Sequence, residues 1–285
     1  MIIAALIAIT DPSDSTLKAR IQQEFSSVNG EFALAFKDLQ TGEELLINEK
    51  TNFHAASTMK TPVMIEVYRQ AAAGKFALSD SVTVHQNFKS IADGSEYILD
   101  QSSDSEQDLY KLMGRKASIY DLMYRMIIRS SNLATNMIIE LVGARNVNQT
   151  MREIGAKDIQ VLRGVEDIKA YEKGMNNTTT AYDQMLMYSA LATGKLASPE
   201  NTKAMISVLL DQQFNEIIPA HLPKDVKVAH KTGSITGVQH DAGIVYLPDG
   251  RKYLLVLLSK GLEDEKAGIE VLAKVSGIVL SSAMR

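Results

Sequence analysis

The stretch AGIVYLPDGRKYLLVLLS, residues 242–259, predicts a β-hairpin near the end of the chain. Residues 242–247 and 253–259 are rich in β-branched and aliphatic side chains, and Pro248-Asp249-Gly250 between them is a turn signal. Residues 226–235 form another run of the same kind. Three such runs in succession predict neighbouring strands of an antiparallel sheet.

The start of the chain carries a second predicted hairpin. Residues 32–36 and 44–47 flank the turn Gln40-Thr41-Gly42. An amphipathic helix precedes this hairpin, because apolar residues recur every four positions over residues 17–25. Another helix, over residues 265–282, closes the chain.

The middle of the chain has a mostly helical pattern. The predicted helices cover residues 57–73, 119–128, 133–142, 181–191 and 199–210. Residues 85–116 and 158–180 have no clear period. Long irregular stretches of this kind in a compact domain are often functional loops.

These elements predict the fold class α/β, in the form of an α+β sandwich. Strands from the two chain ends pair in one antiparallel sheet, helices cover the sheet, and an all-helical region is inserted. We expect a single domain over residues 1–285, with an α/β part of residues 12–56 and 212–285 and an all-helical part of residues 57–211. A cleft where the two parts meet is the natural place for a ligand.

The composition restricts the chemistry. Of the 285 residues 45% are hydrophobic and 22% are charged, as in a globular protein. The net charge of −4 supplies no basic surface for a phosphate backbone, so we expect no nucleic-acid partner. The chain has no cysteine, which excludes disulfides, zinc–thiolate sites and cysteine nucleophiles.

Residues 2–9 are apolar but too few to span a bilayer, so we expect no stable membrane span. Two interpretations of this stretch stay open. It is either the remnant of a signal peptide whose basic flank is missing, or the hydrophobic start of a strand or helix.

Ser57 and Lys60 lie in HAASTMKTPVM, residues 54–64, where a helix is predicted to begin. Positions three apart share one face of a helix, so the hydroxyl and the amine come close together. Desolvation lowers the pKa of a lysine, and such a lysine can act as the base that a serine nucleophile needs. The helix N-terminus would favour a developing oxyanion. The spacing alone is weak support, since Ser15 and Lys18 repeat it on a predicted exposed helix start.

Two further segments offer polar groups for a substrate. Ser130 and Asn132 follow a predicted helix and supply a hydroxyl and a carboxamide, although such residues also serve as helix caps. The segment Lys231-Thr232-Gly233-Ser234 lies on a predicted strand. A substrate carboxylate could lie along this strand, or the lysine could protect a strand edge from aggregation.

Acidic residues in the irregular stretch are candidates for a general base. Glu166 and Asp167 could each orient a water molecule, and the sequence leaves open which of them does so. A solvent-facing loop acid is the simpler interpretation of either one. His240 and Asp241 could also form a pair, for which an ordinary structural hydrogen bond is the simpler interpretation.

Taken in order, Ser-x-x-Lys, Ser-x-Asn, a loop glutamate and Lys-Thr-Gly make the chain resemble the class A β-lactamases and related penicillin-recognising serine hydrolases. The resemblance runs from about residue 15 to the end of the chain. It implies a β-lactamase/transpeptidase-like fold and a serine β-lactamase that works through an acyl-enzyme, without cofactor or metal. It further implies a β-lactam or cell-wall peptide-like substrate and a periplasmic or secreted location, and we expect a monomer.

The resemblance also implies a role for each candidate residue. Ser57 would be the acylated nucleophile, activated by Lys60 alone or jointly with Glu166 through a water. Ser130 would pass a proton to the leaving nitrogen, and Glu166 would activate the water that hydrolyses the acyl-enzyme. The remaining residues would bind the substrate: the amide of Asn132, the carboxylate-holding segment of Lys231, Thr232, Gly233 and Ser234, and an oxyanion hole made by the N–H groups of Ser57 and Ser234.

Three residues depart from the family pattern. Ser131 stands where the family usually has an aspartate, and Ala170 where it has an asparagine that helps to hold the hydrolytic water. Asn177 stands where an aspartate usually closes the loop through an arginine. Deacylation is therefore the step that the sequence supports least. The alternatives are a serine peptidase or esterase of the same fold with slow deacylation, or a non-catalytic sensor that binds a β-lactam or a muropeptide.

Overall fold

The structure is a computed structural model and describes residues 12–284. The apolar stretch of residues 2–9, and with it the choice between its two interpretations, lies outside the described residues.

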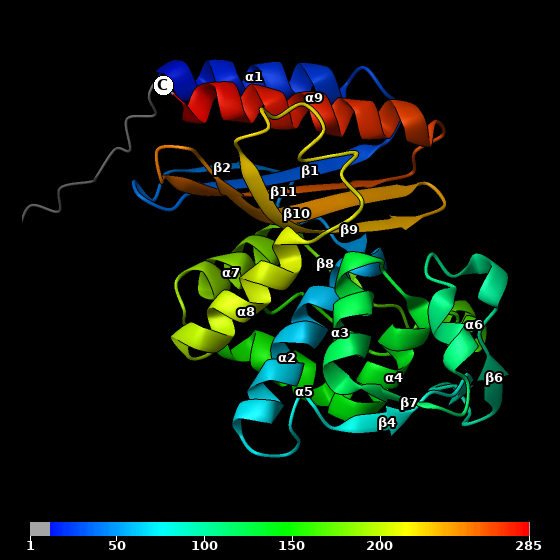
Figure 1. Cartoon of the computed structure of the whole chain (residues 1–285). Helices are drawn as coiled ribbons and strands as arrows, with labels where there is room; N and C mark the ends of the chain where they lie inside the picture. The colour runs from blue at the N-terminus through cyan, green and yellow to red at the C-terminus, as the bar shows by residue number, and fades with distance from the viewer. Residues whose placement is uncertain (1–11, 285) are drawn as a thin grey trace, which may run out of the picture.

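A five-stranded antiparallel sheet runs through the molecule in the order β2-β1-β11-β10-β9 (Figure 1). Its strands are β1 (Glu31–Asp38), β2 (Glu44–Ile47), β9 (Lys227–Ile235), β10 (Val238–Tyr246) and β11 (Lys252–Lys260). The two ends of the chain meet where β1 pairs with β11, from Glu31 opposite Lys260 to Asp38 opposite Tyr253. The prediction of one antiparallel sheet built from both chain ends is confirmed.

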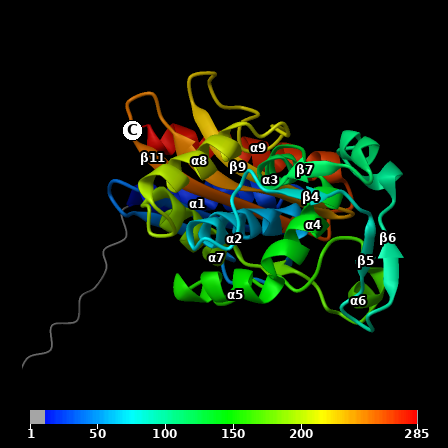
Figure 2. The ribbon, with the colours of Figure 1, turned by 60° about the horizontal axis from the view of Figure 1, so that its bottom comes forward.

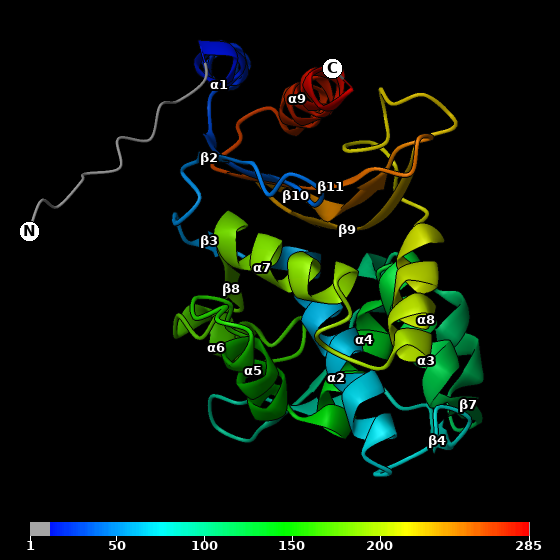
Figure 3. The same cartoon turned by 90° about the vertical axis from the view of Figure 1, so that its left-hand side faces the viewer.

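Strand β11 is buried on both faces, which explains its unbroken apolar sequence. Side chains alternate between the faces of a strand. Leu255 and Leu257 therefore join the core under α1 (Pro12–Phe25) and α9 (Glu265–Ala283), while Leu254 and Val256 join the core shared with the inserted region. Figure 3 shows α1 and α9 on one side of the sheet and the other helices on the opposite side.

The inserted region is organised around one central helix. Its helices are α2 (Lys60–Ala72), α3 (Ile119–Ile128), α4 (Asn132–Val142), α5 (Ala144–Glu153), α6 (Ile168–Glu172), α7 (Ala181–Ala192) and α8 (Pro199–Leu210). Helix α2 is buried along most of its length and contacts α3, α4 and α5. The residues just before it, Ala56–Met59, form a 3₁₀ turn. None of the helices within residues 12–284 is both long enough and apolar enough to cross a bilayer.

The expectation that residues 57–211 are all-helical is wrong. Two-stranded ribbons join β4 (Ser81–Thr83) to β7 (Lys116–Ser118), β5 (Asn87–Lys89) to β6 (Glu96–Ile98), and β3 (Phe53–His54) to β8 (Thr178–Thr179). Strands of two or three residues are too short to produce a readable period. The β5–β6 ribbon and α6 lie together at one end of the molecule (Figure 2).

Candidate active site

The turn that carries Ser57 is held in a strained conformation at the head of α2. Ala56 has φ +44°, a left-handed value that costs a residue with a side chain about 1 kcal/mol. The N–H of Ala56 donates to Nδ1 of His54 at 3.0 Å, and the hydroxyl of Thr58 donates to the carbonyl of Ala55 at 2.6 Å. Burial, with the charge of Arg163, lowers the pKa of His54, which keeps Nδ1 free to accept this bond. These contacts hold the residues on both sides of Ser57.

Ser57 faces a cavity of about 380 Å³ between the sheet and the inserted region. Six of the nine residues proposed from the sequence line it: Ser57, Ser130, Asn132, Thr232, Gly233 and Ser234. Strand β9 passes so close to the serine turn that a Cβ on Gly233 would lie 3.1 Å from the nitrogen of Ser57. The other three, Lys60, Lys231 and Glu166, are not among the lining residues but hydrogen-bond to them. The four distant segments thus meet at one place.

Lys60 is fully buried, and its amine donates to residues of the α3–α4 turn. Nζ lies 2.7 Å from the carbonyl oxygen of Ser130, 3.1 Å from its Oγ and 3.2 Å from Oδ1 of Asn132. Burial lowers the pKa of Lys60 to about 7, although the charges of Asp104 and Glu166 oppose this effect. An amine with this pKa is available as a base near neutral pH.

Lys231, on strand β9, contacts the same hydroxyl of Ser130. Its Nζ donates to Oγ of Ser130 at 3.2 Å and to the carbonyl of Thr232 at 2.9 Å. Burial, followed by the charge of Lys60, lowers the pKa of Lys231 well below its usual value. Ser130, at φ +56°, therefore connects two buried amines.

Glu166 and Asp167 point in different directions. The Glu166 carboxylate accepts from Nδ2 of Asn132, a residue that lines the cavity, at 3.1 Å. Asp167 is buried and caps α6, accepting from the N–H of Ala170 at 3.1 Å and the hydroxyl of Ser90 at 2.7 Å. Glu166 has φ +61°, which turns the two neighbouring side chains apart. Glu166 is therefore the loop acid next to the other candidate residues.

A carboxylate from a distant segment binds the start of α4, next to Ser131. The hydroxyl of Ser131 caps α4 by accepting from the N–H of Ala134 at 3.2 Å. The buried carboxylate of Asp104 accepts from the N–H groups of Asn132 at 3.0 Å and Leu133 at 2.9 Å. Sequence reasoning missed Asp104, because no spacing pattern connects it with a helix that begins 28 residues later.

The loop that carries Glu166 is closed by a neutral amide. Oδ1 of Asn177 accepts from the N–H groups of Leu162 at 2.8 Å and Arg163 at 3.1 Å, and its Nδ2 donates to the carbonyl of Arg163 at 3.0 Å. Ala170 is fully buried within this loop. Of the departures from the family pattern, Ala170 is thus accommodated by apolar packing and Asn177 by neutral hydrogen bonds.

The possible pair of His240 and Asp241 does not form. The two residues are neighbours on β10, so their side chains point to opposite faces. Asp241 accepts from Nδ1 of the buried His230 at 2.8 Å. His240 lines the cavity, where Nε2 lies 2.9 Å from the carbonyl of His54, and burial lowers its pKa to about 4. His240 was not among the site residues proposed from the sequence.

No group of three or more His, Asp and Glu side chains within the described residues could hold a metal ion. The polar groups around Ser57 are hydroxyls, amines, amides, carboxylates and the imidazole of His240, which suit nucleophilic catalysis with proton transfer.

Comparison with known proteins identifies the family of the chain. The model of the beta-lactamase enzyme family matches residues 16–283. The chain belongs to this family. Among its relatives, the extended-spectrum β-lactamase PER-1 of Pseudomonas aeruginosa is 23% identical over 244 residues, which are 82% of this chain and 76% of that protein. The β-lactamase CARB-3 of Pseudomonas aeruginosa is 25% identical over 232 residues, or 77% of this chain and 76% of that protein.

Two solved structures have the same fold. A β-lactamase from Sphaerobacter thermophilus superposes with a TM-score of 0.80 and 28% identity, over 96% of this chain and 98% of that one. A mutant of PBP-A, solved as an acyl-enzyme complex with penicillin G, has a TM-score of 0.82 and 26% identity, over 95% of this chain and 97% of that one. The β-lactamase-like fold expected from the sequence is confirmed.

Proposed function

We propose that this protein is a serine β-lactamase that hydrolyses the β-lactam amide through an acyl-enzyme on Ser57. The observation that carries the proposal is the hydroxyl of Ser130 between two buried amines, beside the cavity that Ser57 faces. The same family includes PER-1 and CARB-3, and a mutant of PBP-A forms an acyl-enzyme with penicillin G.

In the acylation step, Oγ of Ser57 attacks the lactam carbonyl and its proton passes to the neutral amine of Lys60. The N–H groups of Ser57 and Ser234 stabilise the oxyanion. When the C–N bond breaks, Ser130 gives its proton to the leaving nitrogen and takes a proton from Lys60, which lies 3.1 Å from it. Lys231, Thr232 and Ser234 hold the substrate carboxylate.

In the deacylation step, the Glu166 carboxylate takes a proton from a water molecule, and the oxygen of that water attacks the ester carbonyl. The bond to Oγ of Ser57 then breaks, and the proton returns to this oxygen. Asn132 connects the two half-reactions, because its Oδ1 accepts from Lys60 at 3.2 Å and its Nδ2 donates to Glu166 at 3.1 Å.

The alternative of a serine peptidase or esterase with slow deacylation is favoured by one observation. Ala170 offers no polar side chain for a hydrolytic water. This alternative predicts a long-lived penicilloyl adduct on Ser57. A non-catalytic sensor is less compatible with the site, because it needs neither a buried base nor a loop carboxylate.

The test is hydrolysis of a chromogenic cephalosporin by the wild type and by Ser57→Ala, with Ser26→Ala as a control. Ser26 is exposed and its hydroxyl donates to the carbonyl of Gln23, so its variant keeps full activity. The proposal is supported if the wild type hydrolyses the cephalosporin and Ser57→Ala does not. A stable adduct without turnover favours the peptidase or esterase, and reversible binding without any adduct favours the sensor.

Because substrates of this class lie outside the cytoplasm, we also propose export to the periplasm or medium, which cell fractionation tests.

A further inference from the structure

The Glu166 carboxylate is held mainly by a segment far from its own loop. The N–H of Asp100 donates to Oε2 at 2.9 Å, and the hydroxyl of Ser103 donates to Oε1 at 3.0 Å. Asn132 supplies the third donor, at 3.1 Å. A carboxylate accepts about four hydrogen bonds, so one acceptor position is left for water.

Position 170 cannot supply such a donor. The side chain of Ala170 is a fully buried methyl group, and its N–H donates to Asp167 at 3.1 Å. Ser103, in contrast, lines the same cavity as Ser57. Its hydroxyl has one proton and two acceptors in reach, Glu166 and the carbonyl of Asp100 at 2.9 Å. The carboxylate is the stronger acceptor of the two.

The segment of residues 100–103 has its own internal support. Asp100 caps a short 3₁₀ turn, Gln101–Ser103, and its carboxylate accepts from the N–H of Ser102 at 2.9 Å. The N–H of Ser103 donates to the carbonyl of Asp100 at 3.1 Å. The turn therefore presents the Asp100 N–H and the Ser103 hydroxyl in the same direction.

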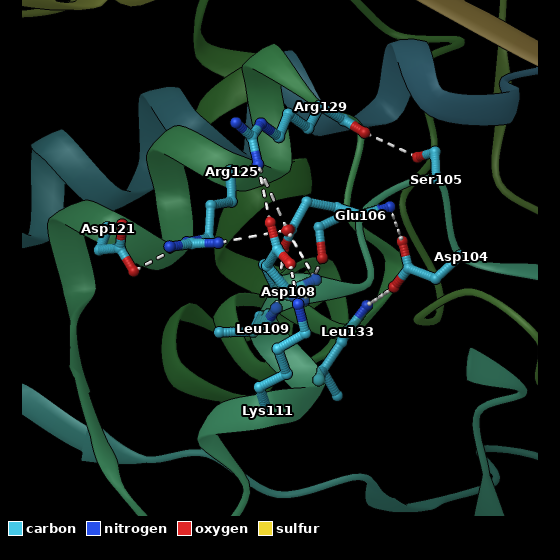
Figure 4. Close-up of polar contacts among 12 residues, drawn as sticks. Asp104, Ser105, Glu106, Asp108, Leu109, Lys111, Asp121, Arg125, Arg129 and Leu133 are labelled. Atoms are coloured by element: carbon cyan, nitrogen blue, oxygen red, sulfur yellow. Dashed lines mark hydrogen bonds and ion pairs between the residues drawn. The ribbon is translucent and has the colours of Figure 1, made fainter. Parts of the chain in front are cut away.

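The residues that follow anchor this segment to the helices of the site (Figure 4). Asp104 accepts from the first N–H groups of α4, and the buried Glu106 lies 3.2 Å from Arg125 and 3.5 Å from Arg129. Arg125 and Arg129 belong to the end of α3 and the residue after it, on the other side of the Ser130 turn. The position of Ser103 is thus tied to both helices that flank Ser130.

We propose that Ser103 is a positioning residue for hydrolysis of the acyl-enzyme. Its hydroxyl fixes the Glu166 carboxylate from outside the loop, a task for which Ala170 has no polar group. The inference rests on the acyl-enzyme route proposed above. Acylation depends on Lys60 and Ser130, which Ser103 does not contact, so loss of the hydroxyl affects deacylation selectively.

The test compares Ser103→Ala with the matched control Ser102→Ala and with Ser103→Thr, which keeps a hydroxyl. Ser102 is also exposed, and its hydroxyl hydrogen-bonds to the Asp100 carboxylate. Stopped-flow measurement of the burst with a chromogenic cephalosporin gives the acylation rate. Intact-protein mass spectrometry after removal of free substrate gives the decay of the Ser57 adduct.

We expect Ser103→Ala to slow adduct decay by about tenfold or more while acylation stays within about twofold, as for a small displacement of one catalytic group. Ser102→Ala behaves like the wild type, and Ser103→Thr restores decay. In the double variant Ser103→Ala/Glu166→Gln, decay is no slower than in Glu166→Gln alone, because Ser103 acts through Glu166.

Unchanged decay in Ser103→Ala, an equal loss in both half-reactions, or failure of Ser103→Thr to restore decay would overturn this inference and leave the proposed function intact. If the wild type forms no adduct at all, the proposed function fails first, and the role of Ser103 fails with it.

Discussion

The side-chain nitrogens of Lys60 and Lys231 lie 3.1 and 3.2 Å from the same atom, Oγ of Ser130. Both side chains are fully buried. Two ammonium groups this close in a desolvated place repel each other, so the pair favours a state in which one amine is neutral. The arrangement therefore supplies a base and a cation at a single hydroxyl.

The first prediction concerns the pH dependence of acylation. Lys60 accepts a proton only when it is neutral, and its pKa is lowered to about 7 by burial. The neutral fraction grows as the pH rises through this value, so acylation is slow at pH 5 and reaches a plateau above pH 8. In Lys60→Arg the guanidinium stays protonated, and we expect acylation to fall by about 10²–10⁴.

Single-turnover kinetics between pH 5 and 9 checks this prediction. The matched control is Lys18→Arg, since Lys18 belongs to the second Ser-x-x-Lys of the chain and is exposed. An acylation rate that is flat across this range, or a Lys60→Arg variant with wild-type acylation, would show that another group is the base.

The second prediction concerns Asp104, one of the charges that face Lys60 together with Glu166 and Lys231. The charge of Asp104 raises the pKa of Lys60. In Asp104→Asn this charge is lost, so the pKa of Lys60 falls further below about 7. The acid limb of the pH profile of the acylation rate then moves to lower pH. The carboxylate also accepts from four donors, among them the N–H groups of Asn132 and Leu133. The amide cannot satisfy all of them, and stability falls by about 1–3 kcal/mol.

Asp108→Asn is the control for this charge change, because Asp108 lies on the same loop but is exposed and pairs with Lys111 at 2.7 Å. Urea unfolding gives the stability, and the pH profile of acylation gives the shift. An acid limb that moves to higher pH in Asp104→Asn would contradict the assignment of Lys60 as the base.

Much of the framework could be predicted from local sequence because its elements are long and periodic. Helices α3 and α8 begin and end at the predicted residues, with Ser118 and Ser198 as caps that accept from the N–H groups of Asp121 and Asn201. Helix α5 was not predicted. Its sequence, ARNVNQTMRE, turns only Val147 and Met151 to the core as large apolar side chains, so its apolar face is too narrow to stand out.

The parts of the site that could not be predicted depend on contacts between distant segments. Asp104 and Ser103 belong to a stretch without period, and their partners Asn132 and Glu166 lie 28 and 63 residues away. His240 was interpreted through its neighbour in sequence, whereas a strand turns neighbours apart. The motifs identified the chemical groups, and the supporting contacts required the tertiary structure.

The third prediction concerns the close approach of β9 to the serine turn. A Cβ on Gly233 would lie 3.1 Å from the nitrogens of both Ser57 and Thr58. In Gly233→Ala the turn has to move by a few tenths of an ångström, which displaces the nucleophile and its N–H. We expect acylation to fall by up to about 10². The change in stability stays within about 1–3 kcal/mol.

Gly277→Ala is the control for this substitution. Gly277 lies within α9, and its nearest neighbour would be Cβ of His221 at an ordinary 3.8 Å. Alanine favours the helix by about 1 kcal/mol, so this variant is as active as the wild type and slightly more stable. If Gly233→Ala acylates at the wild-type rate, the turn tolerates displacement and the oxyanion hole is not set by this contact.

The fourth prediction concerns the neutral closure of the Glu166 loop. Nδ2 of Asn177 donates to the carbonyl of Arg163 at 3.0 Å, and Asn177 is 3% exposed. Asn177→Asp brings the sequence closer to the family pattern but sets a carboxylate oxygen against that carbonyl. We expect the free energy of unfolding to fall by about 1–3 kcal/mol at pH 8. At low pH the introduced carboxyl is protonated and can donate in place of the amide. Its pKa is therefore higher in the folded than in the unfolded protein, and stability relative to the wild type is lost as the pH rises above about 4.

The neighbouring residue supplies the control. Oδ1 of Asn176 accepts from the guanidinium of Arg163 at 3.1 Å, a bond that a carboxylate keeps and strengthens. Asn176→Asp is therefore as stable as the wild type or more so at pH 8. Thermal unfolding of both variants at pH 4 and pH 8 separates the two positions. If Asn177→Asp is as stable as the wild type at both pH values, Arg163 turns to the new carboxylate and closes the loop by an ion pair, and the neutral amide is not what holds this loop together.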